Sequence, residues 1–151
     1  PFSIVMHSPE AARRISHLGT YLRFESAIPR RDSELAICAT AREFDCHHEY
    51  VAHARLAREN GISDGTIELI GRRGPLEELP EDDRLPVRFA RELLRDNELS
   101  DEAFNAARER YGETGVIDLT ATIGYYSMMA CLLNGLQIIP PDPANRLPSV
   151  Q

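Results

Sequence analysis

Signals that start and stop helices recur along almost the whole chain, and no stretch alternates apolar and polar residues as a half-buried strand does. Ser8, for example, is a good N-cap and is followed by a proline at the first helical position. The same kind of punctuation predicts helices over about residues 9–24, 33–43, 46–60, 64–71, 83–95, 101–112 and 113–133. We therefore expect an all-α fold, and 151 residues fit a single domain.

Several of these boundaries depend on particular capping residues. Asp32 or Ser33 is the expected N-cap of the second helix, and Asp45 that of the third, after a short break at residues 44–45. An uninterrupted helix over residues 33–60 is the alternative. Pro86 is expected in the first turn of its helix, where proline is tolerated.

The last predicted helix is apolar nearly all round between Val116 and Leu133. A membrane span needs about 20 apolar residues, but this segment carries Asp118 and two threonines, so a buried core or subunit-interface helix is the better interpretation. The proline-rich stretch that follows predicts an extended tail. We accordingly expect a helical domain over residues 1–139 and a tail over residues 140–151.

Composition excludes several classes of function. The formal net charge of −7 argues against nucleic acid as a partner. All 17 basic residues are arginine, so a Schiff-base lysine and a P-loop lysine are both impossible. Three cysteines at irregular spacing predict no disulfide framework, and with no signal peptide at the start they favour a reducing, cytoplasmic setting.

The chemistry of the chain is concentrated on one face of the third predicted helix. At about 100° per residue, Glu49 lies about 60° from Cys46, and His53 returns to within about 20° of it. A thiol, a carboxylate and an imidazole together can move protons or attack an electrophile. The helix dipole would favour a thiolate at Cys46, whereas nearby acids oppose it. The plainer alternative is a core cysteine beside a solvated Glu–His pair.

A metal site is a second possibility, because three histidines and Glu49 fall within residues 47–53. However, His47 points about 100° and His48 about 200° away from Cys46, so no single face gathers all three histidines. We therefore predict neither a metal nor another cofactor.

Four stretches resemble the carboxymuconolactone decarboxylase family, whose helical fold is shared with alkylhydroperoxidase D-like proteins. They are residues 28–37 (IPRRDSELAI), 46–53 (CHHEYVAH), 56–63 (LARENGIS) and 123–134, the last resembling the family's final core helix. The resemblance implies an alkylhydroperoxidase D-like helical bundle. It also implies a small-molecule substrate and a homo-oligomer, either a trimer or a hexamer.

The peroxidase branch of this fold offers four matching positions: Glu34, Cys46, His48 and His53. Its second cysteine is replaced here by Glu49, so the resolving thiol of a two-cysteine peroxidase is missing. Cys38 would lie about 12 Å away along a continuous helix, too far for a disulfide. A peroxidase would thus use Cys46 alone, with a thiol supplied from outside.

The decarboxylase branch fits Glu49 better and gives the leading hypothesis. An unsaturated lactone acid can accept the electrons left behind by carbon dioxide, so no cofactor is needed. By this hypothesis His53 donates a proton, and Glu34 and Glu49 orient it. An arginine holds the substrate carboxylate; Arg42 is the nearest along the sequence, and Tyr50 is the second substrate-binding candidate. A one-cysteine antioxidant protein and a non-catalytic binding or assembly module are the alternatives.

Overall fold

The computed structural model describes residues 5–140, 142 and 146–150, and within these ranges the chain is helical and contains no strand. The elements are α2 (Pro9–Phe24), α3 (Arg30–Glu43), α4 (His47–Glu59), α5 (Asp64–Gly71), the short 3-10 helix η1 (Leu76–Glu78), α6 (Glu81–Arg95) and α7 (Asp101–Gly135). The predicted all-α class is confirmed.

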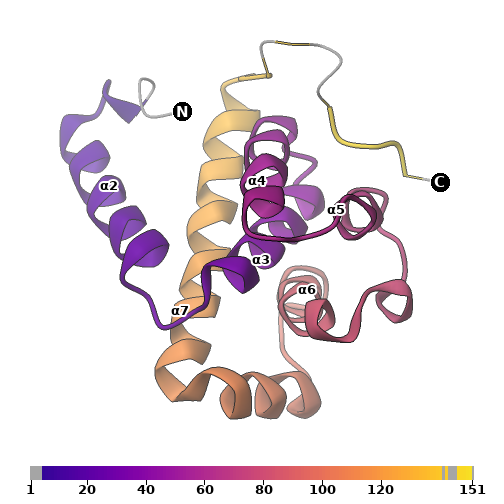
Figure 1. Cartoon of the computed structure of the whole chain (residues 1–151). Coiled ribbons are helices and arrows are strands. Elements are labelled where there is room, and N and C mark those ends of the chain that lie inside the picture. The colour runs from indigo at the N-terminus through magenta and orange to yellow at the C-terminus, as the bar shows by residue number, and fades with distance from the viewer. Residues whose placement is uncertain (1–4, 141, 143–145, 151) are drawn as a thin grey trace.

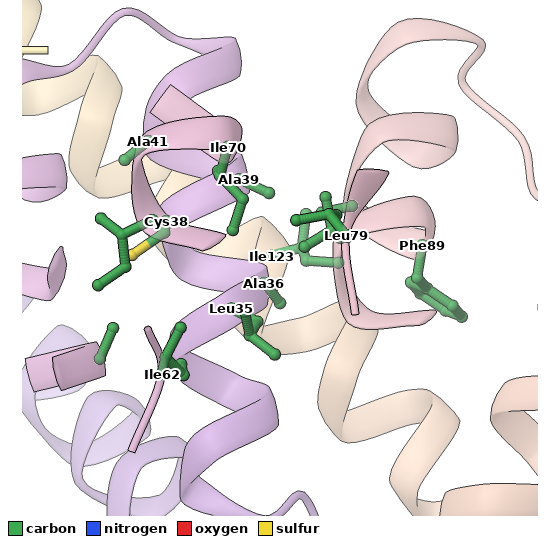
Figure 2. Packing of buried hydrophobic residues seen from close by; sticks show 14 of the residues in the cluster. Leu35, Ala36, Cys38, Ala39, Ala41, Ile62, Ile70, Leu79, Phe89 and Ile123 are labelled. Atoms are coloured by element: carbon green, nitrogen blue, oxygen red, sulfur yellow. The ribbon is translucent and has the colours of Figure 1, made fainter. Parts of the chain in front are cut away.

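Helix α3 lies at the centre of the molecule and packs against α4, α5, α6 and α7 (Figure 1). It is buried over nearly its whole length because small side chains let the neighbouring helices approach closely. Figure 2 shows this core, in which Ala36 and Ala39 alternate with larger residues such as Leu35, and which also includes Ile123 and Phe89 from other helices. Charged side chains in the middle of α3, such as Glu34, are therefore held away from water.

Helix α2 is the exception to this close packing. It stands to one side of the bundle and packs mainly against α7 (Figure 1). Gly19 makes that contact possible, because a Cβ at this position would lie 2.3 Å from the hydroxyl oxygen of Tyr125. The space between α2 and the bundle is thus bordered by three helices, α2, α4 and α7.

A sharp break separates α3 from α4, so the continuous-helix alternative is wrong. Asp45 adopts a positive φ of 50°, and the Cys46 amide donates to the carbonyl of Ala41 at 2.8 Å. Cys46, not Asp45, is the N-cap of α4. Asp45 takes the left-handed conformation that aspartate tolerates, and its carboxylate pairs with Arg42 instead of capping the helix.

The start of α3 was also predicted wrongly. The helix begins at Arg30, directly after Pro29, so Asp32 and Ser33 lie inside it. Asp32 is needed elsewhere, because its carboxylate accepts a hydrogen bond from Tyr111 at 2.7 Å.

Proline and glycine shape the second half of the chain. Pro86 lies inside α6 rather than in its first turn, because α6 already begins at Glu81. Proline has no N–H to bond the carbonyl four residues earlier, and the guanidinium of Arg110 donates to that carbonyl, of Asp82, at 3.0 Å. The predicted helix end at Gly112 is a kink within α7, where Gly112 has φ 71° and ψ 177°.

The C-terminal part of α7 is long and apolar enough to cross a membrane, but 56% of its most apolar stretch is buried within the fold. Leu119, Ile123 and Leu133 are among its fully buried residues. Packing in the core accounts for this composition, as the polar residues in the segment predicted.

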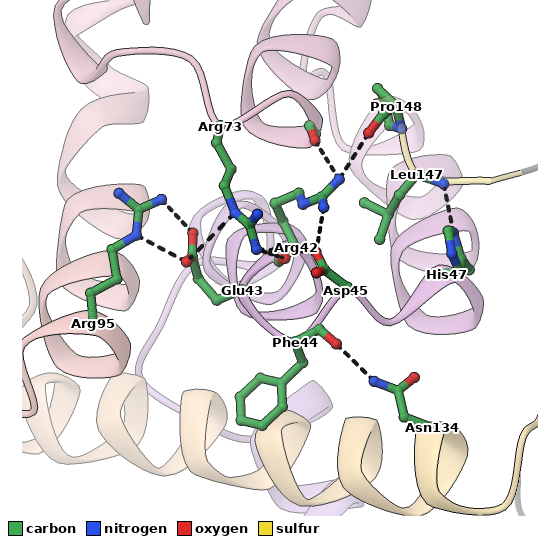
Figure 3. Close-up of polar contacts among 11 residues, drawn as sticks. Arg42, Glu43, Phe44, Asp45, His47, Arg73, Arg95, Asn134, Leu147 and Pro148 are labelled. Carbon is green, nitrogen blue, oxygen red and sulfur yellow. Dashed lines mark hydrogen bonds and ion pairs between the residues drawn. The ribbon is translucent and has the colours of Figure 1, made fainter. Parts of the chain in front are cut away.

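The last described residues return to the helical core (Figure 3). Leu147 is buried in the main core cluster, and its amide donates to Nδ1 of His47 at 3.0 Å. The carbonyl of Pro148 accepts a hydrogen bond from Arg42 at 2.8 Å. Part of the predicted tail, residues 141, 143–145 and 151, lies outside the described residues. The described remainder is held against α3 and α4.

Candidate active site

The centre of the candidate site is His53, which is 6% exposed and lies between two carboxylates. Its Nδ1 is 2.6 Å from Oε2 of Glu34, and its Nε2 is 3.2 Å from Oε2 of Glu49. Glu49 comes from the preceding turn of α4, at i,i+4 spacing, whereas Glu34 comes from the buried face of α3. The structure brings together three of the residues named from the sequence.

Charge compensation explains how these acids tolerate burial. Glu34 is completely buried, and its second oxygen is 2.6 Å from the guanidinium of Arg30. Burial acts to lower the pKa of His53, but the hydrogen bonds and charges of Glu34 and Glu49 outweigh it, so the pKa of His53 is raised. The two carboxylates therefore favour the charged form of His53, which can donate a proton.

A pocket of about 220 Å³ opens beside this group. Helix α4 contributes His48, Glu49, His53 and Leu56, α7 contributes Tyr125, Tyr126 and Met129, and α2 contributes Arg23. The ring of Tyr126 meets the His53 ring edge-on, with 4.7 Å between centroids and 80° between planes. The pocket thus combines a proton donor with a largely apolar wall.

Arg23, Tyr125, Tyr126 and Met129 were not named from the sequence. Arg23 is in the last turn of α2, thirty positions before His53, and nothing in the local sequence separates it from the other arginines. Tyr126 belongs to the segment between Val116 and Leu133 that the sequence shows to be apolar nearly all round. Their shared pocket depends on how α2 and α7 pack, which helical periodicity does not specify.

Cys46 does not belong to this pocket. It is fully buried against Ala130 and Leu133 of α7. Burial raises the pKa of its thiol, although the backbone amides of Glu49 and His48 act to lower it. The balance between dipole and acidic neighbours that the sequence left open is thus dominated by loss of solvent.

The other two cysteines also lie away from the pocket. Cys38 packs in the main core (Figure 2), and burial raises its pKa strongly. Cys131 is exposed on α7, and all three cysteines are free.

The two proposed substrate-binding residues lie elsewhere. The guanidinium of Arg42 donates to the carbonyls of Gly71 and Pro148 and pairs with Asp45 (Figure 3), so it fastens the tail rather than facing His53. Tyr50 donates from its hydroxyl to the carbonyl of Ile67 at 2.6 Å and borders a different surface pocket. Both side chains are engaged within the fold.

The histidines next to the site do not converge on one point. His47 accepts a hydrogen bond from Leu147, whereas His48 lines the pocket. Among the residues that the structure describes, no group of three or more His, Cys, Asp and Glu side chains is arranged to hold a metal ion.

Comparison with known proteins bears on this site. Residues 9–77, which include Arg23, Glu34, Glu49 and His53, match the sequence model of the carboxymuconolactone decarboxylase family. A search of curated proteins finds no significant match.

Solved structures show the same fold. An uncharacterised peroxidase-related protein from Silicibacter sp. TM1040 superposes with a TM-score of 0.72 at 17% identity, over 90% of this chain and 72% of that one. A protein of unknown function from Agrobacterium tumefaciens, described as a candidate antioxidant defence protein AhpD, gives a TM-score of 0.73 at 19% identity, over 92% of this chain and 97% of that one. Residues 9–77 are thus similar to the carboxymuconolactone decarboxylase family, and the chain has the alkylhydroperoxidase D-like fold.

Proposed function

We propose that the protein is a cofactor-free decarboxylase, or catalyses a closely related proton transfer, on a small unsaturated lactone or carboxylic acid of aromatic catabolism. The observation that carries the proposal is His53, held between the carboxylates of Glu34 and Glu49 on the wall of a small pocket, where both acids favour its protonated form. The similarity of residues 9–77 to the carboxymuconolactone decarboxylase family supports a reaction of this general kind.

In the proposed reaction the bond between a substrate carbon and its carboxylate breaks and carbon dioxide leaves. The electron pair moves through the adjacent double bond onto the lactone carbonyl. His53 then supplies a proton to carbon as the carbonyl re-forms, and solvent later replaces that proton. The apolar wall around Tyr126 and Met129 favours decarboxylation. Where water is excluded, the localised charge of the carboxylate is less stable than the delocalised charge that remains on the substrate after carbon dioxide leaves.

Glu34 and Glu49 act on this step through His53. Glu34 accepts a hydrogen bond from Nδ1 of His53 and thereby fixes the orientation of the ring. Nε2 is then directed towards Glu49 and towards the pocket, which His53 and Glu49 both line. The two carboxylates keep the imidazole charged until the substrate takes its proton. Glu34 is therefore a positioning residue, whereas Glu49 and His53 reach the reacting group.

A thiol peroxidase is the second candidate, favoured by the two structural relatives named after peroxidase and antioxidant proteins. It would require Cys46 to reach a hydroperoxide as a thiolate. The complete burial of Cys46 and the raised pKa of its thiol argue against this.

Purified protein assayed for loss of γ-carboxymuconolactone and for thiol-dependent consumption of hydroperoxide distinguishes these functions. We expect lactone turnover that is lost in H53Q and retained in C46S. Peroxide turnover abolished by C46S would overturn the decarboxylase proposal in favour of the second candidate. Silence in both assays, with a small ligand retained on purification, would indicate a binding module.

We also propose that the protein is a cytoplasmic homo-oligomer, a trimer or a hexamer. Large apolar side chains at the surface support self-association, among them Phe24, 70% exposed, and Ile117, 68% exposed. Light scattering coupled to size exclusion tests the assembly, and a mass of 17.0 kDa in solution would contradict it.

A further inference from the structure

Arg23 stands out among the charged residues that border the pocket because nothing in the described chain balances its charge. It forms no ion pair there, and its buried Nε has no hydrogen-bond partner. Its guanidinium carbon lies over the ring of Phe24, 5.1 Å from the ring centroid. A buried guanidinium nitrogen without a partner is unfavourable, and a ligand that accepts a hydrogen bond from it would remove that cost.

The acids of the pocket are already engaged. Glu34 is shared between Arg30 and His53, and Glu49 is paired with His53. Neither of these carboxylates forms an ion pair with Arg23, so the guanidinium of Arg23 is available to an anionic ligand in the pocket. The matching ligand is an anion.

His48 provides a second unused polar group on the same wall. Its Nδ1 is buried and has no hydrogen-bond partner among the described residues. Beside these two groups the wall is formed by Leu56, Tyr126 and Met129, which suit the apolar body of a ligand. Planar guanidinium groups pair best with planar oxyanions, above all carboxylates.

We propose that Arg23 is the carboxylate-binding residue of the pocket, with His48 as a second polar contact, and that it selects small anionic ligands with an apolar body. The inference deepens the proposed function, on which it rests for taking this pocket as the substrate site. The carboxylate held by Arg23 is one that the reaction retains, because an ion pair would stabilise a departing carboxylate in the ground state and slow its loss.

Calorimetric titration with benzoate and with benzamide, its neutral counterpart, tests the inference without any need for turnover. We expect the wild type to bind benzoate at least about tenfold more tightly than benzamide. R23Q should remove this preference by weakening benzoate binding while benzamide binding stays the same, and R23K should restore part of it.

R14Q is the matched control, because Arg14 is on the same helix but is exposed and paired with Glu10. It should bind both probes like the wild type. Thermal unfolding of each variant verifies that the fold is intact. A wild type without preference for benzoate, or an R23Q variant that keeps the preference, would overturn the inference.

The two proposals fail in distinguishable ways. If benzoate binding depends on Arg23 but no lactone is consumed, the inference stands and the proposed function falls. If lactone turnover is present and lost in H53Q, while R23Q retains the wild-type preference for benzoate, the function stands and the role of Arg23 falls.

Discussion

His53 is almost completely buried, and burial alone would disfavour its charged form. The 2.6 Å contact with Glu34 and the 3.2 Å contact with Glu49 favour that charged form instead. At this scale the site is a compensated set of charges, in which removing one member leaves another without a partner.

The raised pKa of His53 predicts the pH dependence of the reaction. The proton donor should remain charged above 6.5, the ordinary value for histidine, and kcat/KM should fall as pH rises through the elevated value. The stabilisation from the charged histidine should follow the same direction: fully present below 6.5 and lost as pH rises through the folded-state value. Histidine NMR titration measures this pKa directly.

H17Q serves as the control for this titration, since His17 is exposed on α2. It should remove one NMR signal and leave the pH–rate profile unchanged. A titration of His53 at or below the ordinary value would contradict the prediction.

The burial of two cysteines predicts strongly unequal thiol reactivity. Cys131 is exposed and should react rapidly with Ellman's reagent, whereas Cys38 and Cys46 should react only after unfolding. C131S should therefore abolish the fast reaction in native protein. A fast phase that persists in C131S and disappears in C46S would show that Cys46 is accessible.

At the scale of helices, sequence punctuation was a good guide to where elements lie and a poor guide to caps. Ser63 and Ser100 cap α5 and α7, and each side chain accepts a hydrogen bond from a backbone amide. Asp45 and Asp32 failed as caps because tertiary partners bind their carboxylates, Arg73 that of Asp45 and Tyr111 that of Asp32. Local propensity does not include such partners.

The residues of the candidate site also differ in how far the sequence predicts them. Glu49 and His53 were predicted together because i,i+4 spacing places them side by side within one helix. Glu34 came from the family resemblance, since its contact with His53 crosses from α3 to α4. Arg23 could not be found from either, because α2 meets the pocket only through its packing on α7.

Two glycines of α7 differ in backbone conformation, so replacing each by alanine should change stability in opposite directions. Gly112, at φ 71° and ψ 177°, is in a region that essentially only glycine adopts, so G112A should destabilise the protein by about 1–3 kcal/mol. Gly124 is helical with open space around it, so G124A should be neutral or stabilise by up to about 1 kcal/mol. Denaturant unfolding measures both, and equal effects would contradict the prediction.

At the scale of the whole molecule, the C-terminal segment joins distant parts of the chain. Arg42 links it to the end of α5, and His47 receives its backbone amide (Figure 3). The sequence predicted an extended segment but not its docking, because Leu147 is a single apolar residue with no periodic pattern around it.

This docking predicts that the segment contributes to global stability. L147A should lower the free energy of unfolding by about 2 kcal/mol, because it removes a buried side chain from the core. V150A is the control, since Val150 is 47% exposed and should change stability little. Chemical denaturation compares the two variants. A wild-type midpoint for L147A would show that, in solution, the C-terminal segment is not packed against the helices.

The separate position of α2 has a consequence for how this fold can diversify. The proton donor and its carboxylates lie on α3 and α4, whereas Arg23 lies on a helix that stands apart from them. Recognition and reaction are thus encoded in different segments of the gene. A chimaera that exchanges only α2 would acquire a new choice of ligand while inheriting the proton-transfer machinery intact.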